Sequence, residues 1–191
     1  MSRGLKGLAL VFTIFILIPF MPESWHNRMD SIATYEEDAS AMGRINAWYA
    51  AFYLAKDRFM GGGFDGINSL DIFQTYAPNP LNYHDAHSIY FEVLGDHGFV
   101  GLGLFLLMAL LVWKMASGVI KDTEKREDLQ DFNSLAKMLQ VSLIAYLTGG
   151  LFLGLAYFDL YYILIVLVLL SRYLVDQQLS ARIIIDKDLK K

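Results

Sequence analysis

Long runs without charged residues constrain this chain more than any other feature of its sequence. Such runs begin near positions 5, 98, 138 and 160, and hydrophobic residues make up 55% of the 191 positions. An α-helix needs about 20 apolar residues to cross a hydrocarbon core of about 30 Å, which is close to the length of these runs. The sequence therefore predicts an all-α polytopic membrane protein with four transmembrane helices.

The placement of Lys and Arg predicts how these helices are oriented. Only four of the 16 basic residues fall between positions 21 and 97, whereas that stretch holds 11 of the 20 acidic residues. Basic residues concentrate on the cytoplasmic side of membrane proteins, so both termini are predicted to be cytoplasmic. Transmembrane helix 1 is predicted at 1–20, and a long, partly helical periplasmic loop follows at 21–97. Transmembrane helix 2 is predicted at 98–118, with a cytoplasmic loop at 119–137. Transmembrane helices 3 and 4 form a tight hairpin at 138–175 that only Asp159 interrupts, and a cytoplasmic tail follows at 176–191.

The first apolar run has a second interpretation. Arg3 and Lys6 stand before or within it, as in a secretory signal peptide. Against that interpretation, the nearest pair of small residues with this spacing, Ala39 and Ala41, lies about twenty residues too late for cleavage. We therefore predict an uncleaved membrane anchor.

The composition argues against several other classes of protein. The chain has no cysteine, which excludes disulfides and thiolate chemistry, and a net charge of −4 offers no basic surface to nucleic acid. No ionisable side chain is predicted deep inside a span, which disfavours a transporter. We predict no cofactor and no metal, because the spacing of His84, His87 and His97 around Asp85 is not a recognised zinc pattern.

The 21–97 loop is predicted to have a helical centre. Ser40 is a candidate N-cap, and Asp57 with Arg58 marks the end of the helix. An apolar stripe with helical spacing runs between them and is predicted to lie on the membrane surface or against neighbouring spans. The stripe consists of Ile45, Trp48, Tyr49, Phe52 and Ala55.

A glycine-rich turn follows at 61–66. Its sequence matches the dinucleotide pattern G-x-G-x-x-G, but no strand precedes it and no βαβ unit follows, so a nucleotide site is rejected. We interpret this turn as a flexible connection near the bilayer surface. The alternative is a glycine-rich backbone that approaches an anionic headgroup or a pyrophosphate.

A short helix is predicted from 86 to 94, stopped by Gly95 and Gly98. His87 would lie in its first turn, on one face with Tyr90, and the positive end of the helix dipole would disfavour the imidazolium there. A neutral imidazole is what a general base requires. Glu92 would point away from His87, and the plainer alternative for His87 is an interfacial residue without a catalytic role.

Two arginines of the loop are candidates for binding an anion. Arginine forms bidentate hydrogen bonds to phosphate and keeps its charge when it is desolvated. Arg58 is also explained as a favourable cation at a helix C-terminus, whereas Arg44 lies near a helix N-terminus, where a cation is mildly unfavourable. A purely structural explanation is therefore weaker for Arg44.

Several short blocks, taken in their order, resemble the O-antigen ligase family. Their order is fairly specific, although each block alone is weak, and the resemblance covers about residues 35–175. The segments 38–64 and 157–160 are most similar to the O-glycosylation ligases found with exosortase systems. The blocks lie at 40–44 with Trp48, at 61–64, at 86–90 and at 94–101.

The resemblance implies a lipid-diphosphate-dependent glycosyltransferase of the bacterial inner membrane. Such enzymes move a glycan from undecaprenyl diphosphate to an acceptor hydroxyl, on a protein or a lipid-linked sugar, at the periplasmic side, in a metal-independent, inverting reaction. By motif match, His87 assists the acceptor hydroxyl and Arg44 holds the pyrophosphate, with Arg58 in a matching block and Tyr90 as a further substrate contact.

The resemblance also leaves alternatives open. Family members usually have about twice this length, and this chain corresponds to their C-terminal portion. Either the chain is a truncated gene product, or an N-terminal companion chain supplies the rest. An O-antigen polymerase would use the same kind of donor, and a non-catalytic membrane subunit would use none. Neither the glycan nor the acceptor follows from the sequence.

Overall fold

The computed structural model describes residues 21–25 and 39–188, and these contain helices but no β-strand. The chain divides into two compact units, Met1–Met42 and Gly43–Lys191, and the second holds all the candidate site residues. The all-α prediction is therefore confirmed for the described residues. The predicted first transmembrane helix, 1–20, lies outside them.

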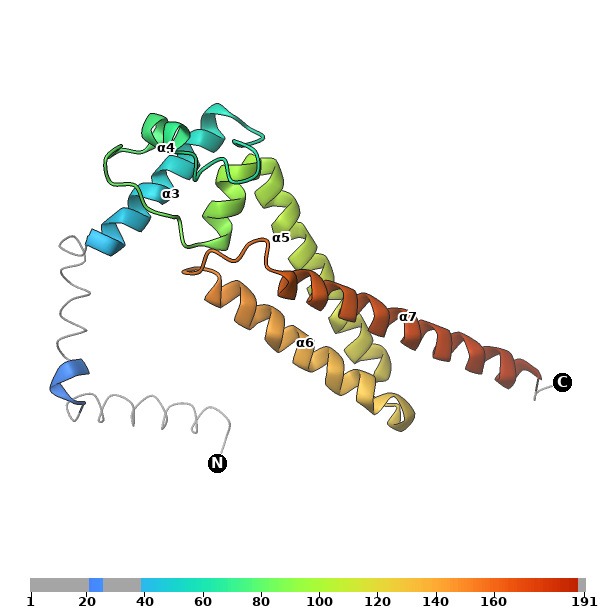
Figure 1. Ribbon diagram of the computed structural model, residues 1–191. Coiled ribbons are helices and arrows are strands. Elements are labelled where there is room, and N and C mark those ends of the chain that lie inside the picture. Colours follow the sequence, from blue (N-terminus) through green and yellow to red (C-terminus); the bar gives the residue numbers. More distant parts are fainter. Residues whose placement is uncertain (1–20, 26–38, 189–191) are drawn as a thin grey trace. The chain divides into compact units, whose positions relative to one another are not determined.

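Three long helices pack against one another in the second unit. They are α5 (Ile89–Thr123), α6 (Gln130–Gly149) and α7 (Asp159–Asp188), with a 3₁₀ turn, η3 (Glu127–Leu129), between α5 and α6 (Figure 1). Phe105, Leu143 and Tyr161 come from the three different helices and meet in the buried core. The helix bundle is thus held by side chains that a membrane-buried and a water-soluble protein would both bury.

The outer surface of this bundle distinguishes a membrane protein from a water-soluble one. Within the described part of the chain, α5 is the one helix that is long and apolar enough to cross a membrane. Large apolar side chains are also exposed on all three helices, where a soluble protein would carry polar ones. This surface fits a lipid environment, while the four-span arrangement stays a prediction. Examples of these exposed residues are Leu107, Leu111, Val141, Ile144, Val166 and Leu170.

The predicted tight hairpin at 138–175 is interrupted earlier than the sequence indicated. α6 begins at Gln130 and ends at Gly149, and residues 150–158 form a connector without helix before α7. The Gly150 carbonyl accepts the Ile89 amide at 2.9 Å, and a Cβ on Gly150 would collide with the Ile89 side chain. This close contact with α5 ends α6, although the apolar residues of the connector would also suit a span.

The predicted helix in the loop is confirmed as α3 (Ala39–Asp57), but it begins at Ala39, so Ser40 lies inside the helix and is not its N-cap. Its buried face also differs from the prediction. Small residues such as Ala47, Ala50 and Ala51 are fully buried, whereas Tyr49 and Phe52 of the predicted stripe are exposed. Small side chains allow the following loop, including the short helix α4 (Leu70–Tyr76), to pack closely on α3. The aromatic side chains are left on the outside.

The helix that follows the loop starts later and continues further than predicted. α5 begins at Ile89 with Ser88 as its N-cap, so His87 lies before the helix rather than in its first turn. Gly95 does not stop the helix. Gly98 kinks it, with φ of 64° and ψ of −163°, a conformation that only glycine adopts readily.

The kink gives a stability prediction. Gly98→Ala is expected to destabilise the protein by more than the 1–3 kcal/mol of a strained backbone, because the new Cβ would also collide with the Phe59 carbonyl. Thermal unfolding in detergent, followed by circular dichroism, measures the loss. Gly103→Ala is the matched control, since Gly103 lies on the same helix and a Cβ there meets nothing within 4 Å. Equal unfolding midpoints for the two variants would contradict this account.

Candidate functional site

His87 lies in a strained segment just before α5. Its backbone has φ of 43°, which is uncommon for a residue with a side chain, and such outliers concentrate at functional sites. Its Nδ1 is 3.3 Å from Oδ2 of Asp85, and its amide donates to Oδ1 of the same carboxylate at 3.4 Å. The two side chains are 49% and 45% exposed. Asp85 thus orients the imidazole and leaves Nε2 as the nitrogen available to a ligand.

Helix α3 holds the segment that carries His87. The Asn46 amide group donates to the carbonyls of Asn79 and Asn82 at 2.8 and 2.9 Å, and its oxygen accepts the Asn79 amide. Trp48 donates from Nε1 to the Ala86 carbonyl at 2.7 Å, directly beside His87. The Trp48 ring also stacks on Phe91 of α5, with 4.9 Å between centroids. The position of His87 therefore depends on both helices.

Arg44 lies one turn before Trp48 on α3, so the two side chains share a face of the helix. The His84 ring packs so closely on the neighbouring Gly43 that a Cβ there would collide with it. Nε of Arg44 and Nδ1 of His84 are both buried without a hydrogen-bond partner among the described residues. A buried donor without an acceptor is costly, which makes Arg44 a candidate for contact with an anionic ligand.

Arg58 does not converge with Arg44. It is exposed just beyond the end of α3, 14 residues from Arg44, which corresponds to about 21 Å along a helix. Near it, the Tyr76 hydroxyl donates to Oδ2 of Asp57 at 2.5 Å. This hydrogen bond raises the pKa of Tyr76, and the charge of Arg58 opposes the rise. The two arginines are therefore placed for separate contacts rather than for one diphosphate group.

The Tyr90 hydroxyl is engaged within the bundle. It donates to the Leu147 carbonyl in α6 at 2.8 Å, and its ring packs edge-on against Phe105. Because His87 is outside the helix, Tyr90 does not share a helical face with it as predicted. These contacts give Tyr90 a role in joining α5 to α6.

The glycine-rich turn packs tightly against α5. The amides of Gly62 and Gly63 donate to the carbonyls of Gly95 and Asp96 at 2.9 and 2.8 Å. A Cβ on Gly61 would collide with the Asp96 backbone. The expectation of a flexible connection is therefore wrong. The alternative of a phosphate cradle also loses support, because two of the amides it would use already bond to protein carbonyls.

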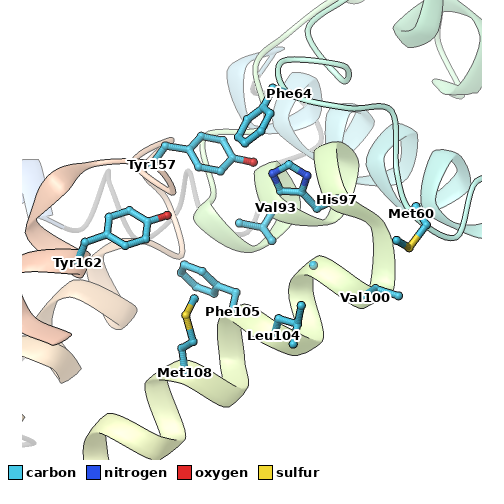
Figure 2. Close-up of a pocket in the computed structure, with 11 residues that line it drawn as sticks. Met60, Phe64, Val93, His97, Val100, Leu104, Phe105, Met108, Tyr157 and Tyr162 are labelled. Atoms are coloured by element: carbon cyan, nitrogen blue, oxygen red, sulfur yellow. The ribbon is translucent and has the colours of Figure 1, made fainter. Parts of the chain in front are cut away.

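An apolar pocket of about 370 Å³ lies along the first turns of α5 beyond the kink (Figure 2). Its floor includes Leu104, Phe105 and Met108. Its mouth is aromatic, because Phe64 from the glycine-rich turn meets the ring of His97 edge-on, at 4.5 Å between centroids, and lies 5.5 Å from Tyr157 of the connector. An apolar chain with a polar end would suit this shape.

A buried carboxylate supports the mouth of the pocket. Asp96 is 2% exposed, and its Oδ2 accepts the Tyr157 hydroxyl at 2.9 Å. Burial raises the pKa of Tyr157, and the negative charge of Asp96 adds to the rise, so Tyr157 remains a hydrogen-bond donor. Sequence reasoning assigned no role to either residue. Their pairing joins positions 61 residues apart, which neither periodicity nor motif spacing indicates.

The connector at 150–158 also reaches the surroundings of His87. The Ala156 amide donates to Oε2 of Glu92 at 3.1 Å. A Cβ built on Gly154 would lie 3.4 Å from Oδ2 of Asp85, 3.7 Å from Oε2 of Glu92 and 3.8 Å from Cα of His87. The prediction that Glu92 points away from His87 is therefore wrong, because it rested on a helix through His87.

Among the residues that the structure describes, no group of three or more His, Asp or Glu side chains is arranged to hold a metal ion. The chemistry that these residues can perform is proton transfer, at His87 with Asp85, and anion binding, at Arg44. Proton transfer needs a substrate with an exchangeable proton, and anion binding needs a charged group, near the N-terminal end of α5.

Comparison with known proteins identifies the family. Residues 1–106 match the family described as O-antigen ligase. No curated protein and no solved structure matches the chain. The matched segment is more than half of the 191 residues, and it includes Arg44, the glycine-rich turn and His87. This chain therefore belongs to the O-antigen ligase family, whose members are membrane-integral and act as glycosyltransferase-like ligases.

Proposed function

We propose that the chain is the catalytic portion of a glycan ligase that uses undecaprenyl diphosphate as the glycan carrier. The transfer takes place at the periplasmic side of the bacterial inner membrane, where the loop at 21–97 and the connector face outward. The protein spans the membrane four times, with both termini in the cytoplasm. The observation that carries the proposal is the Asp85–His87 pair, held by α3 at the N-terminal end of an apolar helix.

The proposed reaction is an in-line displacement at the anomeric carbon of the carried sugar. The acceptor oxygen forms the new glycosidic bond, while the bond between the anomeric carbon and the diphosphate oxygen breaks. The acceptor proton moves to Nε2 of His87, and the leaving group departs as undecaprenyl diphosphate. Asp85 fixes the imidazole through Nδ1 and stabilises the imidazolium that forms.

Two further features support a lipid-diphosphate donor. Arg44 has a buried Nε without a partner among the described residues, and an oxygen of a diphosphate would supply the missing acceptor. The pocket beside Tyr157 has an apolar floor on α5 and suits the first part of a polyprenyl chain. Together these features support a donor that has both a charged and an apolar part.

The acceptor is a hydroxyl group on a protein or on a lipid-linked sugar. The similarity of 38–64 and 157–160 to exosortase-associated O-glycosylation ligases favours a protein hydroxyl. An N-terminal companion chain is proposed as a partner, because the resemblance is to the C-terminal portion of longer enzymes. Assays therefore replace the gene at its native locus, so that any companion chain is present.

The sidedness of the loop tests the proposal, and the absence of native cysteine makes the test simple. Leu81→Cys lies at a position that is 92% exposed, and Lys125→Cys lies in the predicted cytoplasmic connection. A maleimide that cannot cross the inner membrane is expected to label Leu81→Cys in whole spheroplasts. It should label Lys125→Cys only after lysis.

Labelling of Leu81→Cys only after lysis would overturn the proposal, because undecaprenyl-linked glycans are joined to their acceptors outside the cytoplasm. The unmodified chain controls for background, since it has no thiol.

A further inference from the structure

The connector at 150–158 lies beyond the segment that matches the family, yet it packs on the residues around His87. Three hydrogen bonds to α5 fix it there. The Gly150 carbonyl accepts the Ile89 amide at 2.9 Å, the Ala156 amide donates to Glu92 at 3.1 Å, and the Tyr157 hydroxyl donates to Asp96 at 2.9 Å. These anchors make the connector a wall of the site rather than a free loop.

One position in this wall faces the proposed base without a side chain. Gly154 is exposed, and a Cβ there would stand at van der Waals distance from Asp85, Glu92 and the His87 backbone. Its φ lies outside the range that requires glycine, and no backbone of another segment crowds it. The glycine is therefore not needed by the fold, and what it provides is the space of a side chain beside two carboxylates and the backbone of His87.

We propose that Gly154 is a specificity-determining residue, whose missing side chain leaves room for the acceptor hydroxyl beside His87. Glu92 is a positioning residue, because it holds the connector at the distance that keeps this space open. The inference rests on the proposed function. It adds that the acceptor enters along the connector, whereas the donor contacts Arg44 and the pocket on α5.

The chemistry of the space suits a hydroxyl acceptor. A hydroxyl group donates one hydrogen bond and accepts others, so it can donate to a carboxylate of Asp85 or Glu92 while it approaches. Its proton then passes to Nε2 of His87 in the reaction described above. A bulky side chain at position 154 would occupy this approach without touching Arg44.

The test compares Gly154→Leu with Gly149→Leu in native membranes. Gly149 is a matched control, since it is exposed five positions earlier and a Cβ there meets nothing within 4 Å. The donor is the lipid-linked glycan extracted from cells that lack the gene, and the acceptor is the unmodified envelope fraction of the same cells. Release of undecaprenyl diphosphate is measured while each concentration is varied.

Gly154→Leu is expected to raise the half-saturating acceptor concentration by about 5- to 150-fold, as expected from steric overpacking of about 1–3 kcal/mol. The half-saturating donor concentration should stay unchanged, and Gly149→Leu should match the unmodified protein. Gly154→Ala should fall between them, because its Cβ makes only ordinary contacts. Glu92→Gln keeps an acceptor for the Ala156 amide, and it should retain more transfer than Glu92→Leu.

Two results would overturn the inference. One is an unchanged acceptor dependence in Gly154→Leu, and the other is an equal rise in the donor and acceptor values. Failure of the proposed function gives a different result, namely donor release that does not depend on His87 at all. Thermal unfolding of each variant in detergent shows whether a loss of transfer comes from a loss of fold.

Discussion

His87→Asn is expected to lower the rate of glycan transfer by about 10²- to 10⁴-fold, the range for loss of a general base. Asparagine tolerates the left-handed backbone that His87 adopts at φ of 43°, so the fold around it should be kept. It cannot take up the acceptor proton. The rate is measured as undecaprenyl diphosphate released in native membranes at saturating donor and acceptor.

The choice of asparagine separates chemistry from backbone strain. His87→Ala removes the same base, but alanine is less tolerant of the left-handed region, so any instability would be larger in that variant. Equal losses of transfer in both variants, with a lower unfolding midpoint only in His87→Ala, would show that the imidazole is what matters. Transfer within about threefold of the unmodified rate in His87→Asn would remove His87 from the mechanism.

Asp85 gives an independent check of the same mechanism. Asp85→Asn retains an oxygen that can accept from Nδ1 of His87 but lacks the charge that stabilises the imidazolium. Its transfer rate is expected to fall, and the fall should be smaller than in His87→Asn. If Asp85 only shaped the loop, Asp85→Asn would transfer at the full rate.

The sequence predicted the helices better than it predicted the residues that each helix buries. The end of α3 followed from Asp57 and Arg58, because charge signals at helix ends are local, whereas its start did not, because the helix begins at Ala39, before the Ser40 that was predicted as its N-cap. Its buried face did not follow, because the alanines of α3 are covered by a loop that lies more than 30 residues later in the chain. Asn46 of α3 donates hydrogen bonds to this loop. Hydrophobic spacing cannot show that small side chains are buried while aromatic ones are exposed.

For the site, too, the sequence indicated single residues but not the contacts between segments that are distant in the chain. His87 and Arg44 were identified from motif order, but their geometry depends on contacts across the fold. The backbone of His87 is strained between Ala86, which Trp48 holds, and the start of α5. The expectation for Glu92 was wrong because it assumed that the helix already includes His87. The connector was missed because its apolar residues are typical of a span.

The largest effect on donor binding is expected for Arg44. Arg44→Met keeps much of the length of the side chain and removes the charge and every hydrogen-bond donor. A hydrogen bond to a charged group contributes about 1.5–3 kcal/mol, so the half-saturating donor concentration should rise by about 10- to 150-fold. The measurement follows undecaprenyl diphosphate release against donor concentration at a fixed, saturating acceptor. Lys56→Ala, an exposed cation in the last turn of α3, is the matched control and should leave the value unchanged.

Stability distinguishes this role from a structural one. In the protein without donor, Nε of Arg44 is buried and has no partner among the described residues, so removing it costs no hydrogen bond there and relieves an unsatisfied donor. Arg44→Met is therefore expected to unfold at the same temperature as the unmodified protein, or at a higher one, while donor binding falls. A residue that held the loop in place would give the opposite pattern. A lower unfolding midpoint with an unchanged donor dependence would show that Arg44 supports α3 and its neighbours, and that the diphosphate is bound elsewhere.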